Sequence, residues 1–230
     1  HKKSGQPGVF ALFSDAEDDH SWQEGFRQLR DRILEINASL FADHEQRGLA
    51  DAFILQRLED AENVLHDVQN LCRHGHFALQ NYLQTVREML ASIGEIHSAA
   101  NTAQLLQLHG INARFIDLSG WQSDVHLSLD EHVKRAFADV DLSTELPIAT
   151  GYSHCQGGLM ETFDRGYSEM IFSRIAVLTG AREAPSSAGK PPHATVVKIF
   201  DEDGKPVPQA LRDRGVVPFL FFLCRPWSCY

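Results

Sequence analysis

Apolar residues recur at helical spacing through most of the first half of the chain. In the segment from Ala50 to Leu71 they form one stripe with steps of three and four residues, at Ile54, Leu58, Ala61, Leu65, Val68 and Cys72. Similar but weaker patterns run through Asp15–Phe41, Tyr82–Ile93 and Ala99–His109. Such a stripe marks the buried face of an amphipathic helix. The pattern predicts four helices packed as antiparallel neighbours, the last of them ending at Gly110.

The hydrophobic period changes after Gly110. A short β-like run at Ala113–Leu118 and a short apolar run at Leu146–Ala149 are typical of strands, whereas Asp130–Val140 and Ser168–Leu178 have helical patterns. Alternation of strands and helices favours a parallel sheet with crossover helices. The sequence therefore predicts an α/β chain with a helix-rich first half and a partial parallel sheet after it. In such sheets, ligands bind where strands end and helices begin.

Composition and charge narrow the class of protein. The chain has 230 residues, of which 43% are hydrophobic and 23% charged, as in ordinary globular proteins. Its net charge of −10 argues against nucleic acid or an anionic membrane surface as a partner. The four cysteines (Cys72, Cys155, Cys224 and Cys229) lack paired spacing, which favours reduced thiols over a disulfide framework. Without a signal peptide or a membrane-length apolar run, we expect a cytoplasmic protein.

The most informative segment runs from Leu146 to Arg182. Its expected strand is followed by Thr150-Gly151 and a loop, and Arg165 lies just before the next expected helix. A helix start offers unpaired N–H groups and a partial positive charge. The guanidinium of Arg165 can hold a carboxylate with two hydrogen bonds. The segment therefore predicts a binding site for a small carboxylate.

Two motifs in this chain resemble those of aspartate kinases. The residues Thr150-Gly151-Tyr152, and later Phe163-Asp164-Arg165-Gly166-Tyr167-Ser168-Glu169, are similar to a Gly-Phe turn followed by Gly-Arg-Gly-Gly-Ser-Asp. Upstream, Gly94-Glu95-Ile-His-Ser98-Ala99 is similar to the Gly-Glu-x-x-Ser-Ala box of that family. The sequences of these motifs are most similar to those of the divergent aspartate kinases found with ectoine biosynthesis genes. The similarity covers roughly Lys2 to Ala184.

The resemblance implies a fold and an activity. It implies an incomplete amino-acid kinase (carbamate-kinase-like) fold. Residues 1–110 would form the helical part of the substrate lobe, residues 111–184 an α/β core segment with the substrate motif, and residues 185–230 an atypical tail. The family phosphorylates the side-chain carboxylate of L-aspartate, using ATP and Mg²⁺, to give 4-phospho-aspartate. That reaction is the first step toward lysine, threonine and methionine, or toward ectoine.

The resemblance also implies a set of substrate-binding residues, namely Glu95, Thr150, Gly151, Tyr152, Arg165, Gly166, Ser168 and Glu169. We expect Arg165 to bind a substrate carboxylate, and Glu95 to bind the ammonium group or to orient Arg165. A solvated position at a helix end is the equally weighted alternative for Glu95. Ser168 is expected to cap the helix. Glu169 stands where the family has aspartate, and Tyr167 replaces a glycine.

Other parts of the family pattern are missing from this stretch. The family's opening phosphate loop has no counterpart, and Lys134 matches no catalytic position. We therefore expect no catalytic residue, no resident ATP or Mg²⁺, no metal site, and no activity of this chain alone. The sequence leaves open whether the chain forms a homodimer. The alternatives are another amino-acid kinase, such as a glutamate or carbamate kinase, or a noncatalytic helical interaction module.

Three further patterns are expected to carry no chemistry. His74 and His76 lack a further ligand at metal-site spacing. The pair His154-Cys155 has no orienting partner for a thiolate–imidazole mechanism. The run Gly166–Met170 lacks the last glycine of a hydrolase elbow.

The tail differs in character from the rest of the chain. Pro185–Pro192 is a cluster of breaker residues, followed by an expected strand at Thr195–Phe200 and an apolar run at Val216–Leu223. In the ectoine-type relatives, Arg-Glu-Ala is followed by Ile-Ile, and the codons GCC-ATC-ATC read one nucleotide over give Pro-Ser, as at Pro185-Ser186. We hypothesise that the tail is translated in a shifted frame, the alternative being a genuine divergent tail. Sequencing the source DNA tests this hypothesis.

Overall fold

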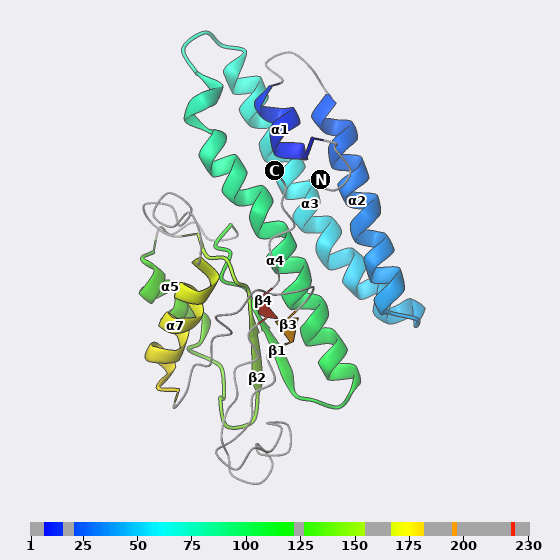
Figure 1. Ribbon diagram of the computed structural model, residues 1–230, viewed down its shortest axis with the longest axis vertical. Coiled ribbons are helices and arrows are strands. Elements are labelled where there is room, and N and C mark those ends of the chain that lie inside the picture. Colours follow the sequence, from blue (N-terminus) through cyan, green and yellow to red (C-terminus); the bar gives the residue numbers. More distant parts are fainter. Residues whose placement is uncertain are drawn as a thin grey trace. The chain divides into compact units, whose positions relative to one another are not determined.

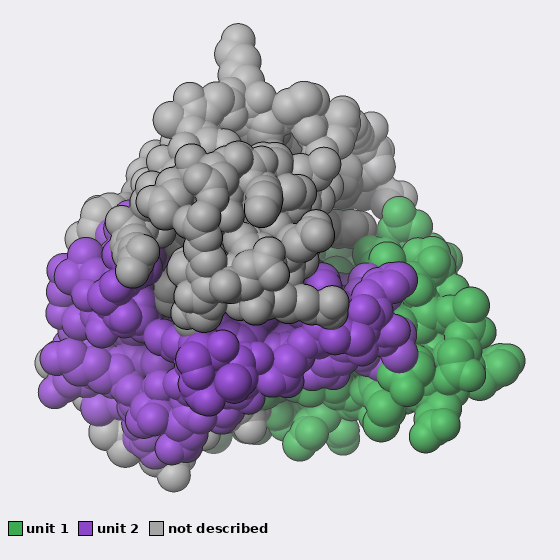
Figure 2. Space-filling model, turned by 90° about the horizontal axis from the view of Figure 1, so that it is seen from below, with its two compact units in different colours: residues 1–94, 226–230 green, residues 95–225 purple. Residues whose placement is uncertain are grey.

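The computed structural model describes residues 7–15, 21–121, 127–154 and 167–181, and two short strands at 195–196 and 222–223. The described residues divide into two compact units, one ending at Gly94 and the other beginning at Glu95 (Figure 2). Each unit is described by itself below. No helix among the described residues is long and apolar enough to cross a membrane.

The first unit is helical. It contains α1 (Val9–Ser14), α2 (Ser21–Leu40), α3 (His44–Cys72), the short 3-10 helix η1 (Leu79–Asn81) and the first part of α4 (Leu83–Leu108) (Figure 1). The helices expected near Asp15–Phe41 and Ala50–Leu71 are confirmed as α2 and α3. The elements α1 and η1 were not expected, because one or two turns are too short to show a hydrophobic period.

Helix α3 follows the stripe that its sequence predicts. It begins where the Asp43 side chain accepts a hydrogen bond from the Gln46 N–H, at 2.9 Å. Its buried residues are Ala50, Ile54, Leu58, Ala61, Leu65 and Gln69. Near its end the buried position is therefore Gln69, and the expected Val68 and Cys72 are only half-buried. The stripe keeps a four-residue step there, as the 3.6-residue turn allows.

Polar contacts join α2 and α3 beside an aromatic cluster. The ring of Trp22 is fully buried and meets Phe13 of α1 edge-on, with ring centroids 5.6 Å apart. Farther along, Arg30 forms an ion pair with Glu62 at 2.6 Å. The buried Asn37 amide donates a hydrogen bond to Asp51 at 2.8 Å. Because a buried amide needs a partner, this bond favours one register of the two helices.

Helix α4 corrects the expectation of two helices at Tyr82–Ile93 and Ala99–His109. It runs without interruption from Leu83 to Leu108, through Gly94. One glycine inside a helix costs only about 1 kcal/mol relative to alanine, so it need not end the helix. The expected stop at Gly110 is confirmed.

The end of α4 has a specific backbone geometry. Gly110 has a φ angle of +76°, a conformation that favours glycine. The N–H of Ile111 donates to the carbonyl of Leu106 at 3.0 Å, and the N–H of Gly110 donates to that of Gln107 at 2.9 Å. These two bonds form a Schellman motif, which satisfies carbonyls left open at the helix end.

The second unit is built on a parallel pair of strands. β1 (Ala113–Ile116) pairs with β2 (Leu146–Ala149), in a register that sets Ala113 beside Leu146. Helix α5 (Leu129–Ala136) lies in the connection between them, and α7 (Tyr167–Thr179) follows β2. The predicted α/β alternation is confirmed. β1 ends before Leu118 and α5 ends before Val140, each earlier than expected.

Helices cover both faces of this pair of strands. The side chains of Ala113, Phe115, Leu146 and Ile148 pack with Ala99 and Ala103 of α4. The last residue of each strand, Ile116 and Ala149, packs with the cluster that α5 and α7 form on the other face. This division follows from the two-residue period of a strand. Both faces are largely apolar, the exception in β1 being Arg114, which pairs with Glu145 at 3.2 Å.

A second pair of strands lies in the tail. β3 (Thr195–Val196) pairs antiparallel with β4 (Phe222–Leu223). They coincide with the start of the expected strand at Thr195–Phe200 and with the end of the apolar run at Val216–Leu223. The other residues of these two segments lie outside the described residues.

Candidate functional site

The candidate site lies at the carboxyl end of the β1–β2 pair. Residues 150–154 follow β2, and residues 117–120 follow β1. The two segments are joined because the N–H of His154 donates to the Ser119 carbonyl at 2.9 Å. The start of α7 and Glu95 of α4 complete the site, and all these residues belong to the second unit. Ligands bind at this edge of parallel sheets in general.

Glu95 is a buried carboxyl group in the interior of α4. It is only 3% exposed, so the alternative of a solvated residue at a helix end is wrong. Burial raises the pKa of Glu95 to about 8, although a hydrogen bond from the Gly151 N–H opposes this rise. At neutral pH this carboxyl group is therefore mostly protonated, and its buried Oε1 atom has no hydrogen-bond partner among the described residues.

Gly151 brings two polar side chains to one point. A Cβ atom at this position would lie 2.8 Å from Oε2 of Glu95 and 3.1 Å from Oγ of Ser168. Both side chains therefore converge on the glycine, and any larger residue would displace the carboxyl group. Only glycine leaves room for both side chains to approach the backbone this closely.

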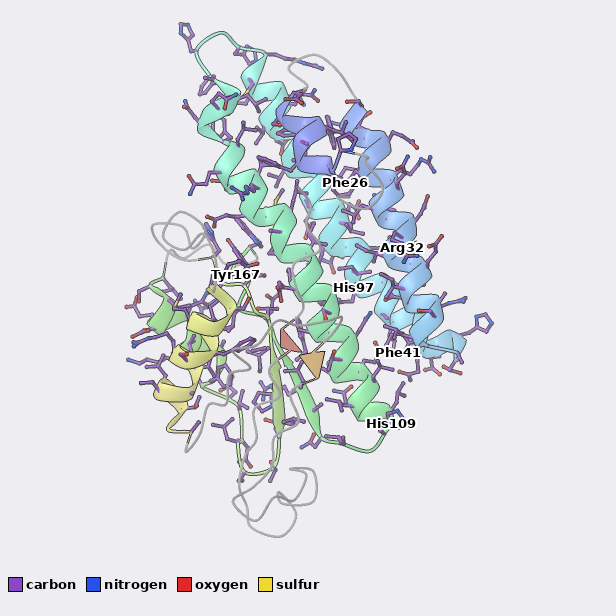
Figure 3. The ribbon with its side chains drawn as sticks, in the orientation of Figure 1. Phe26, Arg32, Phe41, His97, His109 and Tyr167 are labelled. Carbon is purple, nitrogen blue, oxygen red and sulfur yellow. The ribbon has the colours of Figure 1, made fainter. Side chains whose placement is uncertain are left out.

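Ser168 lies inside the first turn of α7. The helix begins at Tyr167, the labelled residue at its upper end in Figure 3. The expected role of Ser168 as the residue that caps this helix is therefore wrong. Its hydroxyl group faces Gly151 instead, and only 9% of the residue is exposed.

Thr150 and Tyr152 are fully buried and hold the segment after β2 in place. The Thr150 hydroxyl accepts a hydrogen bond from the Leu118 N–H at 3.0 Å and donates one to the Tyr152 carbonyl at 2.9 Å. The Tyr152 ring stacks against Trp121, with centroids 6.3 Å apart, and meets Tyr167 edge-on. These contacts occupy the Thr150 hydroxyl and the Tyr152 ring. They position Gly151 between the two residues.

The remaining expected site residues cannot be placed beside Glu95. Arg165 and Gly166 lie outside the described residues. Glu169 belongs to α7, but its side chain is outside the described part of the structure. The pairing of Arg165 with a ligand or with Glu95 stays a prediction.

The structure adds His132, which the motifs did not single out. A capping box between Ser128 and Glu131 fixes the start of α5, so His132 lies in its first turns. Its Nδ1 atom is 3.2 Å from the Ser153 hydroxyl, and a ring N–H donates to the His154 carbonyl. Burial lowers the pKa of His132, against the opposing effect of that hydrogen bond. The capping box was readable in the sequence, but the residues that His132 reaches were not.

No group of three or more histidine, cysteine or acidic side chains gathers as a metal site within the described residues. His74 and His76 are exposed in the turn after α3. The ring of His154 stacks on Trp121, with centroids 4.3 Å apart, and its neighbour Cys155 is outside the described residues.

Comparison with known proteins gives one informative match. The chain is 50% identical over 184 residues to the protein named aspartate kinase Ask_Ect of Stutzerimonas stutzeri (strain A1501). The match covers 80% of this chain and 39% of the relative, so the chain spans about two fifths of the relative's length. No family model and no solved structure matches the chain. The expected resemblance to ectoine-type aspartate kinases is confirmed.

Proposed function

We propose that this chain is the aspartate-binding part of an aspartate kinase. The whole enzyme would transfer the γ-phosphoryl group of ATP to the side-chain carboxylate of L-aspartate, giving 4-phospho-aspartate, in the cytoplasm. The name of the relative that shares half of the aligned residues supports this reaction. The observation that carries the proposal is the buried Glu95 carboxyl group with its unpartnered Oε1 atom.

Aspartate presents two carboxylates and one ammonium group, so its site needs both signs of charge. Glu95 is assigned to the ammonium group. A cation beside Oε1 favours ionisation of Glu95, which burial alone disfavours. The start of α7, with Ser168 and the preceding Arg165, is assigned to the carboxylates. Binding should therefore release a proton from Glu95.

ATP and Mg²⁺ belong to the proposed reaction of the whole enzyme. The residues described here do not fit a nucleotide site, because their one lysine, Lys134, is exposed on α5 and no acidic cluster gathers among them. We assign no step of phosphoryl transfer to them. What they offer is substrate positioning, on which phosphoryl transfer largely depends.

Calorimetry with L-aspartate tests the proposal on the complete chain. We expect saturable binding at pH 7.5, and a heat that varies with the ionisation enthalpy of the buffer because a proton is released. Glu95→Gln should weaken binding at least tenfold and abolish the proton release. Gly151→Ala should also weaken binding, since the added Cβ would meet the Glu95 carboxyl group at 2.8 Å.

Glu59→Gln is the matched control, because Glu59 is exposed on α3 in the other unit. It should bind aspartate as the unaltered chain does. Equal affinity for glutamate would favour another amino-acid kinase. Absence of binding by a folded chain would contradict the proposal and favour the noncatalytic helical module.

A further inference from the structure

His132 connects α5 to the segment that follows β2. Its Nδ1 atom lies 3.2 Å from the hydroxyl of Ser153, which is fully buried, and a ring N–H donates to the carbonyl of His154. Both partners lie on the segment 150–154, which also contains Gly151. The ring also approaches Gly120 after β1, where an added Cβ would lie 3.1 Å from its Cε1 atom.

The segment 150–154 is held at both ends. Thr150 holds its start, and His132 contacts its end. Thr150 fixes the start of the segment through Leu118 and Tyr152. The end is fixed through His132 and through the bond from the His154 N–H to the Ser119 carbonyl. Gly151 lies between the two anchors, and its N–H donates to the Glu95 carboxyl group. A shift of either anchor would therefore move the donor on which Glu95 depends.

We propose that His132 is a positioning residue for the ligand site, acting through Ser153 and His154 to set the place of the Gly151 N–H against Glu95. The proposal rests on the proposed aspartate site. It concerns orientation only, because His132 contacts the segment and not the carboxyl group. A displacement of about 1 Å in a positioned group is enough to weaken a site of this kind strongly.

The two hydrogen bonds require the neutral imidazole. With one ring N–H donating to the His154 carbonyl, the unprotonated nitrogen can accept from the Ser153 hydroxyl. Protonation converts this acceptor into a donor and forces the hydroxyl to turn. The charged groups acting on the ring are Asp117, which favours the protonated form, and Arg135 and His154, which disfavour it. Burial keeps the ring neutral at pH 7 by lowering its pKa.

The experiment compares two substitutions at the same position in the complete chain. His132→Gln keeps a donor and an acceptor, whereas His132→Leu has similar bulk and neither. At pH 7.5, His132→Leu should weaken L-aspartate binding about tenfold, and His132→Gln should stay within about twofold of the unaltered chain. Affinity is measured well below the thermal midpoint of each variant, so that a loss of stability alone does not change it. Equal affinities in all three proteins would overturn the proposal.

The pH profile gives a second readout that a purely structural role would not move. Below pH 6.5, affinity of the unaltered chain should fall more steeply than that of His132→Gln, because protonation of His132 adds to the pH dependence that both proteins share. Release of the Glu95 proton on binding lowers affinity with falling pH in both proteins alike, so the difference between their two profiles isolates the contribution of His132. His109→Gln is the matched control, since His109 is exposed at the end of α4 (Figure 3). Parallel pH profiles of the unaltered chain and His132→Gln would contradict the proposal.

Failure of the proposed function can be told apart from failure of this inference. If the unaltered chain binds no aspartate, hydrogen exchange at the Gly151 and His154 amides still reports the position of the segment. Exchange of both should accelerate in His132→Leu and be unchanged in His132→Gln. Unchanged protection in His132→Leu would overturn the role of His132 without reference to any ligand.

Discussion

At the scale of single residues, Glu95 and Gly151 work as a pair. The carboxyl group is kept out of water by its place in α4, and the glycine supplies a single N–H donor at close range. A carboxylate that accepts two or three such bonds would stay ionised, whereas one donor does not offset the loss of water. At neutral pH the pair therefore holds a neutral acid.

The raised pKa of Glu95 predicts how stability depends on pH. The native state keeps the Glu95 proton up to about pH 8, whereas the unfolded chain loses it near pH 4.5. The native state thus binds more protons between these values, so its stability should fall as pH rises through this window. The full loss is roughly 3–5 kcal/mol, because one pKa unit corresponds to about 1.4 kcal/mol.

Denaturant unfolding of the complete chain and of Glu95→Gln, measured from pH 5 to pH 9, tests this dependence. The difference in unfolding free energy between the two proteins should change with pH by a few kcal/mol, in favour of the glutamine variant at high pH. Parallel pH profiles would show that Glu95 is ionised in the native state.

Two separate motifs supplied Glu95 on the one hand and Gly151 and Ser168 on the other, and the structure brings the side chains of Glu95 and Ser168 together at Gly151. Their role in substrate binding stays a prediction. The sequence could not give the depth at which Glu95 is buried. That depth depends on the continuation of α4 past Gly94. The hydrophobic pattern had predicted two separate helices instead. His132 was missed because its contacts lie across the crossover, and no local pattern encodes them.

At the scale of elements, two glycines of one region have opposite effects on α4. Gly94 lies inside the helix, and Gly110 ends it with a φ angle of +76°. An added Cβ would meet nothing within 4 Å at either position, so packing does not distinguish them. The two glycines differ in backbone conformation, which is helical at Gly94 and left-handed at Gly110. The sequence located the stop because a glycine followed by the loss of the helical period is a strong signal, whereas a glycine within the period is an ambiguous one.

The same substitution should therefore have opposite signs at these two positions. Gly94→Ala should stabilise the chain by about 0.5–1 kcal/mol, because alanine loses less backbone entropy in a helix. Gly110→Ala should destabilise it by about 1–2 kcal/mol, because a Cβ is disfavoured at positive φ. Chemical denaturation of both variants measures the two changes. A stabilising Gly110→Ala would contradict the assignment of a left-handed helix end.

At the scale of the whole molecule, α4 belongs to both compact units. The boundary between them falls at Gly94, inside an unbroken helix. Divided there, either half is no longer than the roughly 15 residues below which an isolated helix is marginal in water. Each half is therefore stabilised by packing within its own unit or by continuity with the other half. The alternation of strands and helices after Gly110 predicted the α/β class of the molecule. The hydrophobic pattern predicted two helices in place of α4, so the sequence did not show that one helix belongs to both units.

This shared helix predicts that the two units unfold together. In native-state hydrogen exchange with increasing denaturant, amides of α3 in the first unit and of β1 and β2 in the second should reach the same unfolding free energy. Gly94→Pro should separate them, because proline removes the hydrogen bond to the residue 90 carbonyl and costs about 3 kcal/mol or more within a helix. Gly48→Pro breaks α3, which lies entirely in the first unit, so it should lower the shared free energy without separating the two sets of amides. Two different free energies in the unaltered chain would show that α4 does not couple the units.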